Sequence, residues 1–267
     1  MLYLDTSAPP AASPMLLVHG SWHDGGCWSA VQQHLAAAGV RSVAPTLPGH
    51  EIAAVRNDVT HDDYVSCVTD ALDRMPTPAI LVGHSFGGSV ISRVAEVRPE
   101  RCSGLVYHSA FVPLDGERVA DSLPPDLVDF LEEAAAASHD RAISLPEALV
   151  RNSFANTANA DVVERVIAKL VPEPHAPIFE SLSLPSFLSL QIPAAYIACS
   201  EDLALPPGAF HPGQSSRLPH AELVEIEGDH ESLFTAPERL ADALLTALNA
   251  LDLARYPRAP GRATSEA

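Results

Sequence analysis

Three side chains that can together activate a hydroxyl group occur in this chain in the order serine, aspartate, histidine. Ser85 lies within the pentapeptide GHSFG, Asp202 follows it, and His230 comes last. A serine hydroxyl is a weak nucleophile at neutral pH, so a histidine must take its proton and a carboxylate must orient that histidine. We therefore predict acyl transfer with Ser85 as the nucleophile, His230 as the general base and Asp202 as the orienting acid.

The residues around Ser85 predict a strand, a tight bend and a helix. Residues 78–82 form an apolar run typical of a buried strand, and apolar residues recur at helical spacing from Val90 to Ala95. Gly83 and Gly87 have no Cβ, which lets the strand and the helix approach each other on both sides of the serine. This G-x-S-x-G turn is typical of a nucleophile held at the top of a sheet.

Several carboxylates could serve as the acid that orients His230. Asp202 and Glu201 directly follow a predicted strand at 194–198, and we favour Asp202. Asp115, in the loop after the preceding strand, is the alternative. Asp229 neighbours His230, and that adjacency directs its side chain elsewhere.

Among the histidines, His230 is favoured as the base because it follows the last predicted strand, at the sheet edge where Ser85 is expected. His84 is expected to be structural, and His108 either lines the pocket or packs. The scattered histidines in polar surroundings are expected to be solvated: His34, His61, His139, His175, His211 and His220.

Acyl transfer also needs donors for the tetrahedral oxyanion. One is the backbone N–H of Phe86, directly after the nucleophile. The other is expected from the loop after the first ordered strand, where Gly20 allows a close approach and Ser21 supplies the N–H.

The elements that must position these groups alternate between strand and helix. Strands are predicted at 15–18, 41–45, 78–82, 104–107, 194–198 and 223–226, with helices at 28–38, 62–74, 87–97 and 237–251. Thr60 is a plausible N-cap for the second helix. This alternation predicts a doubly wound, mostly parallel α/β sheet with helices on both faces.

The alternation stops between residues 112 and 190, where prolines separate short helical segments at 126–137, 145–153 and 160–170. We interpret this stretch as a helical cap over the carboxyl ends of the strands, inserted into one domain spanning 1–267 with its core at 15–111 and 191–252. Residues 1–14 are expected to be at most an edge strand and linker, and 255–267 a disordered tail. The expected substrate-binding side chains are Trp22, His108, Phe130, Phe154 and Phe187.

Composition excludes several classes of function. The formal charge of −18 argues against nucleic-acid partners, which are bound by basic residues. No apolar run approaches the roughly 18 residues that span a bilayer, so no membrane role is expected. Four widely spaced cysteines and a start without a basic leader indicate a reduced, cytoplasmic protein. No metal, phosphate-loop or dinucleotide motif is present, so no cofactor is expected.

Four segments, 17–28, 82–88, 200–202 and 228–230, together resemble the α/β-hydrolase superfamily. The chain is most similar to the branch that holds plant methylesterases, polyneuridine aldehyde esterase and hydroxynitrile lyases, which implies a six-stranded sheet. The resembled lyases carry lysine and threonine where this chain has Glu231 and Ser21. Cyanide chemistry needs a local positive charge, so lyase activity on cyanohydrins is not expected.

The resulting hypothesis is a serine hydrolase that cleaves an ester of a hydrophobic small molecule through an acyl-enzyme. Two alternatives stay open because fold does not dictate function. One is a tailoring enzyme of secondary metabolism with lyase, cyclase or lactone chemistry, and the other is a small-molecule-binding protein with a relict triad. The oligomeric state is open, with a homodimer as one option.

Overall fold

The computed structural model describes residues 12–51 and 54–255 of the chain. A six-stranded sheet runs through it in the order β2-β1-β3-β4-β7-β8, with every neighbouring pair parallel. The strands are β1 (Met15–Val18), β2 (Ser42–Val43), β3 (Ala79–His84), β4 (Cys102–His108), β7 (Ala194–Cys199) and β8 (Glu222–Ile226). All six predicted strands are present, although the second is only two residues long.

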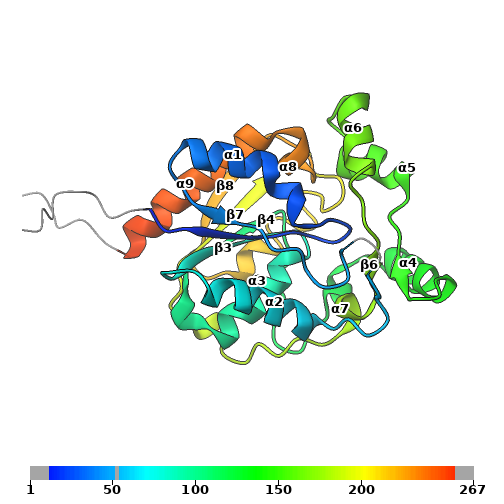
Figure 1. Ribbon diagram of the computed structural model, residues 1–267, viewed down its shortest axis with the longest axis horizontal. Helices are drawn as coiled ribbons and strands as arrows, with labels where there is room; N and C mark the ends of the chain where they lie inside the picture. The colour runs from blue at the N-terminus through cyan, green and yellow to red at the C-terminus, as the bar shows by residue number, and fades with distance from the viewer. Residues whose placement is uncertain (1–11, 52–53, 256–267) are drawn as a thin grey trace, which may run out of the picture.

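Helices cover both faces of this sheet. α1 (Ser29–Ala37), α8 (Ser232–Thr235) and α9 (Pro237–Arg255) lie on one face, and α2 (His61–Asp73) and α3 (Gly87–Val97) lie on the other (Figure 1). Successive side chains of a strand point to opposite faces, so Leu17 packs with α1 and α9 while Leu16 packs with α2 and α3. The predicted doubly wound α/β fold is confirmed.

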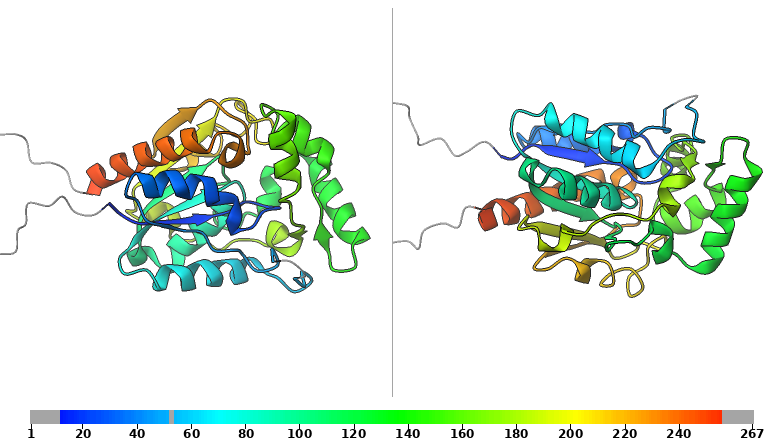
Figure 2. Two further views of the ribbon diagram at one scale, coloured as in Figure 1. Left: turned by 45° about the horizontal axis from the view of Figure 1, so that its top comes forward. Right: turned by 90° about the horizontal axis from the view of Figure 1, so that it is seen from below.

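Residues 112–190 interrupt this pattern. Up to residue 179 their elements lie at one end of the sheet, opposite the end where α9 finishes (Figures 1 and 2), and the rest returns along α3, where the Ser186 amide donates to Glu96. The whole stretch comprises α4 (Pro125–Ala137), β5 (Ala142–Ile143), α5 (Glu147–Leu149), α6 (Ala160–Ile167), β6 (Glu173–Pro174) and α7 (Ala176–Phe179), with 3₁₀ turns at Val119–Ser122 and Phe187–Ser189. We call this segment the insertion.

The insertion differs from its predicted form in two respects. The helix expected at 145–153 is divided into α5 and a π-helical turn, Val150–Phe154. The two-residue strands β5 and β6 form an antiparallel pair that was not predicted, because two residues, one of them Pro174, carry no periodicity. Arg255, expected in the tail, belongs to α9, and the rest of that tail and residues 1–11 lie outside the described residues.

Local signals account for several boundaries. Thr60 caps α2, as predicted, and its side chain and that of Asp63 also form a reciprocal capping box. A 3₁₀ turn, Gly25–Trp28, leads into α1, with Asp24 accepting a hydrogen bond from the Gly26 amide. Within the described part of the chain, no helix has both the length and the apolar character needed to cross a bilayer.

Candidate active site

Ser85 lies on the bend between β3 and α3 in a left-handed conformation, with φ of 51°. A Cβ at Gly83 would lie 2.6 Å from the Gly87 carbonyl oxygen, and one at Gly87 would lie 2.7 Å from that of Val18. The Ser85 amide donates to the His108 carbonyl at 3.1 Å, which ties the bend to β4. The two glycines therefore permit a strained bend that a side chain would block.

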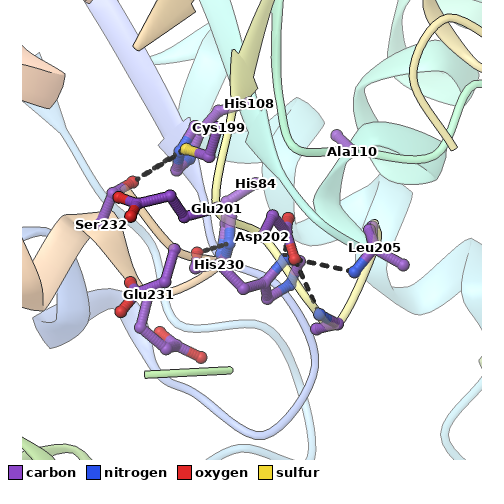
Figure 3. Close-up of polar contacts among 12 residues, drawn as sticks. His84, His108, Ala110, Cys199, Glu201, Asp202, Leu205, His230, Glu231 and Ser232 are labelled. Atoms are coloured by element: carbon purple, nitrogen blue, oxygen red, sulfur yellow. Dashed lines mark hydrogen bonds and ion pairs between the residues drawn. The ribbon is translucent and has the colours of Figure 1, made fainter. Parts of the chain in front are cut away.

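His230 and Asp202 meet in the loops that follow β8 and β7. His230 Nδ1 lies 2.8 Å from Asp202 Oδ2, and both side chains are buried (Figure 3). The other Asp202 oxygen accepts the backbone N–H groups of Ala204 at 2.9 Å and Leu205 at 2.7 Å. Because a carboxylate only accepts, Nδ1 of His230 must carry the proton, which leaves Nε2 as a base. Ser85 and His230 line the same cavity.

The charge environment favours protonation of His230. Burial alone lowers the pKa of this imidazole, but the Asp202 carboxylate and its hydrogen bond, with Glu231 and Asp229, outweigh burial and leave the pKa above 6.5. The arrangement therefore stabilises the imidazolium that a general base forms.

The competing carboxylates are held elsewhere. Asp115 accepts the Leu184 amide at 2.6 Å, Glu201 is exposed, and Asp229 accepts hydrogen bonds from the side chains of Thr157 and Thr235. Of the carboxylates weighed from the sequence, Asp202 is the one placed against His230.

The loop after β1 brings Ser21 to the same cavity. A Cβ at Gly20 would lie 2.8 Å from the Ser85 Cβ, so the missing side chain lets this loop lie directly against the bend. Ser21 and Phe86 both line the cavity, and neither backbone N–H donates a hydrogen bond to any other described residue. Two unpaired N–H groups beside a serine hydroxyl can stabilise an oxyanion.

Two further histidines lie behind His230 (Figure 3). His84 Nε2 donates to the His230 carbonyl at 3.0 Å, and its ring stacks on His108 at 4.9 Å. Burial lowers the pKa of His84, and lowers that of His108 to about 3, so both stay neutral. The expectation that His108 binds substrate is wrong: its side chain does not line the cavity, because Nε2 bonds Ser232 Oγ at 2.8 Å beneath the His230 loop.

The cavity encloses about 200 Å³ between the sheet edge and the insertion. Of the residues predicted to bind substrate, Trp22, Phe130 and Phe154 line this cavity, whereas Phe187 does not. Phe187 is buried near Leu105 and Ala194, at the amino ends of β4 and β7, so its predicted contact with substrate is wrong. The insertion contributes mainly apolar side chains: Val119, Leu123, Leu127, Phe130, Leu131, Leu145, Leu149, Phe154 and Ile178, with Ser153.

Two histidines expected to be solvated are buried: His61, whose amide donates to Glu180 of the insertion, and His175, within the insertion itself. His61 Nε2 lies 3.0 Å from Ser89 Oγ, and burial lowers the pKa of His61 to about 3. His175 stacks on Phe179 at 4.3 Å and bonds Glu132. The residues next to them in sequence did not indicate that other elements would cover these rings.

Two buried polar groups beside the site were not predicted from the sequence. Glu173 of β6 is fully buried and accepts from the Trp22 amide, while His23 Nε2 lies 3.0 Å from both carboxylate oxygens of Glu231. The position of Glu231 directly after His230 was a usable signal; Glu173, between two prolines, had none. Among the described residues, no three His, Cys, Asp or Glu side chains converge as a metal site would need.

Known proteins give an independent comparison. A family model described as alpha/beta hydrolase family matches residues 15–243. A solved extracellular alpha/beta-hydrolase from a Paenibacillus species, whose description reports homology to tobacco salicylic acid binding protein 2, superposes with a TM-score of 0.84 and 38% identity over 88% of this chain and 98% of that one.

Two characterised sequences are similar over most of their length. Pyrethroid hydrolase from Sphingobium wenxiniae is 27% identical, covering 86% of this chain and 85% of that protein. Methylesterase 1 from Arabidopsis thaliana is 28% identical, covering 86% of this chain and 94% of that protein.

Proposed function

The chain belongs to the alpha/beta hydrolase family, in the branch of the plant methylesterases, and from this membership we propose that it is a serine esterase acting on apolar small molecules. The observation that carries the proposal is the hydrogen bond to buried Asp202 from His230, whose side chain lines the same cavity as Ser85. A base with a fixed tautomer beside a strained serine is what acyl transfer to an enzyme hydroxyl requires.

The reaction begins when Ser85 Oγ attacks the ester carbonyl and His230 Nε2 takes the hydroxyl proton. Asp202 holds the resulting imidazolium through Nδ1–H, and the N–H groups of Ser21 and Phe86 bind the oxyanion. Collapse of the tetrahedral intermediate breaks the ester C–O bond, and His230 passes its proton to the leaving alcohol. Water, deprotonated by His230, then attacks the acyl-Ser85 carbonyl. The second tetrahedral intermediate breaks its bond to Ser85 Oγ, His230 returns the proton to that oxygen, and the acid is released.

The lining of the cavity supports an uncharged, apolar ester. Among the described lining residues His230 is the only one with an acidic or basic side chain, so nothing there would pair with a charged substrate. Most remaining contacts are leucine and phenylalanine side chains, which favour hydrophobic acyl or alcohol groups. The relatives named as a pyrethroid hydrolase and a methylesterase also support ester hydrolysis.

Hydrolysis of p-nitrophenyl esters in oxygen-18 water tests the proposal. We expect label in the released acid, labelling of Ser85 by a fluorophosphonate, and a fall in kcat of at least about 10⁴-fold in Ser85→Ala. Undiminished turnover by Ser85→Ala would contradict the assignment. An unlabelled product would favour lyase, cyclase or lactone chemistry, and an unreactive Ser85 would favour a binding protein.

A further inference from the structure

A fully buried carboxylate of the insertion contacts the loop that carries Ser21. Glu173 lies in β6, at the end of the sheet where β1 ends (Figure 1). Its Oε2 accepts the Trp22 backbone N–H at 3.1 Å and lies 2.9 Å from His50 Nε2, and its Oε1 accepts the Tyr64 hydroxyl at 3.2 Å. The core thus provides three donors for one carboxylate of the insertion.

The segments around β5 and β6 also bind the carbonyl oxygen and the indole N–H of Trp22. The Trp22 carbonyl accepts the Val171 amide at 2.8 Å, and the indole N–H donates to the Ile143 carbonyl at 3.0 Å. Ile143 and Glu173 are paired across β5 and β6. The polar atoms of Trp22 are therefore all bonded to this two-stranded sheet and the residues beside it.

Trp22 needs such support because its backbone is in the left-handed region, with φ of 64°. A bulky residue leaves that conformation readily unless neighbouring contacts hold it. Ser21 precedes Trp22, so a rotation of the Trp22 backbone would redirect the Ser21 N–H beside Ser85.

We propose that Glu173 is a positioning residue that holds Trp22 in its left-handed conformation and thereby aims the Ser21 N–H at the oxyanion. The proposal rests on the proposed esterase function. Through this contact, seating of β5 and β6 on the core completes the oxyanion site. Glu173 does not line the cavity and acts through Trp22 alone.

A misdirected oxyanion donor lowers transition-state binding more than substrate binding. Removing a donor altogether lowers kcat about 10²- to 10³-fold, and misplacing one should cost less. We therefore expect Glu173→Ala to lower kcat about 10- to 100-fold with KM within about threefold of the wild type. Affinity for a boronic acid, which forms a tetrahedral adduct on a serine, should fall by the same factor as kcat.

The matched variants are Glu173→Gln and Glu180→Ala in the full chain. Glutamine keeps an oxygen that can accept the Trp22 amide, so kcat and boronic acid affinity should fall together by only about threefold. Glu180 is another carboxylate of the insertion that accepts a core amide, that of His61 at 2.8 Å, but it is not bonded to the Ser21 loop. Glu180→Ala should keep kcat within about twofold.

Circular dichroism and thermal unfolding establish which variants fold. Equal kcat in folded Glu173→Ala and Glu180→Ala would overturn the proposal, as would a loss of kcat without a loss of boronic acid affinity. If Glu173→Ala does not fold while Glu173→Gln matches the wild type, the carboxylate serves folding alone and the proposal is wrong. Ser85→Ala is assayed in parallel: retained turnover there contradicts the esterase itself, whereas its loss with normal Glu173 variants contradicts only this inference.

Discussion

The sheet side and the insertion side of the cavity hold their side chains in different ways. On the sheet side, Ser85, Asp202 and His230 each follow the carboxyl end of a parallel strand, and hydrogen bonds fix their backbone or side chains. On the insertion side, short helices present mostly apolar side chains without directional bonds. The sheet side can therefore define a reaction, while the insertion defines which molecule fits.

The largest expected effect comes from disturbing the sheet side at Asp202. Asparagine keeps the shape of the side chain but can place its amide N–H₂ toward His230 Nδ1, which favours the wrong tautomer. We expect kcat for a p-nitrophenyl ester to fall about 10³- to 10⁴-fold in Asp202→Asn, with little change in folding.

Asp115→Asn is the matched control, because Asp115 is the alternative acid and bonds the Leu184 amide of the insertion. It should keep kcat within about twofold of the wild type. A larger loss of kcat in Asp115→Asn than in Asp202→Asn would reverse the assignment of the acid.

The next largest effect is the pH dependence of kcat/KM, which reports on His230 and not on the neutral histidines behind it. His230 must be neutral to act as a base, and its pKa lies above 6.5, so kcat/KM should fall about tenfold per pH unit below that raised pKa. Stopped-flow or initial-rate profiles from about pH 9 to about pH 6 measure it. An acid limb centred well below pH 6.5 would contradict the role of Asp202 and Glu231 in raising this pKa.

Stability should respond to pH in a different way. A raised pKa means that the contribution of His230 to stability is present below 6.5 and is lost as the pH rises through the folded pKa. The pKa values of His61 and His108 are lowered to about 3, so their contributions are present above 6.5 and are lost as the pH falls toward 3. Each of these two histidines lowers the free energy of unfolding by about 1.4 kcal/mol per pH unit in that window. Urea unfolding should therefore show a net loss of stability below about pH 6.

The sheet side could be predicted from the sequence for physical reasons. Gly83 and Gly87 mark a backbone approach that admits no Cβ, and parallel strands end at one edge, so residues directly after strands are neighbours. Asp202 and His230 follow from that geometry. Their pairing needed no information about side chains elsewhere.

The insertion could be predicted only in outline. Apart from α4, its helical segments are short, so the direction of one side chain depends on packing against elements distant in sequence. The contact predicted for Phe187 was wrong for this reason, and the burial of His175 was missed. His108 on β4 and His61 on α2 lie outside the insertion, but their partners, Ser232 and Ser89, also come from segments distant in sequence. The burial of Glu173 could not be predicted from the sequence, because its three partners, the Trp22 amide, His50 and Tyr64, come from three separate segments.

Two phenylalanines of the insertion provide the next test, since Phe130 lines the cavity and Phe187 does not. Phe130→Ala should lower kcat/KM for a small aliphatic ester about tenfold through KM and shift preference toward bulkier esters. Phe187→Ala should lower the free energy of unfolding by about 3–5 kcal/mol and leave both kinetic constants of the folded protein within about twofold. A shift in ester preference in Phe187→Ala equal to that in Phe130→Ala would contradict the cavity boundary.

The smallest expected effect concerns Ser153, the one polar side chain that the described insertion contributes to the cavity lining. It lies in the π-helical turn, and such turns are frequent at functional sites. Its hydroxyl donates no hydrogen bond to another described residue, so a substrate acceptor could use it. We expect Ser153→Ala to leave kcat/KM for a purely aliphatic ester within about twofold, but to lower it about 3- to 10-fold for an ester of matched size that carries a carbonyl or hydroxyl in the part facing the insertion. Equal effects on the two esters would show that the insertion selects by shape and apolar contact alone, and would make its contrast with the hydrogen-bonded sheet side complete.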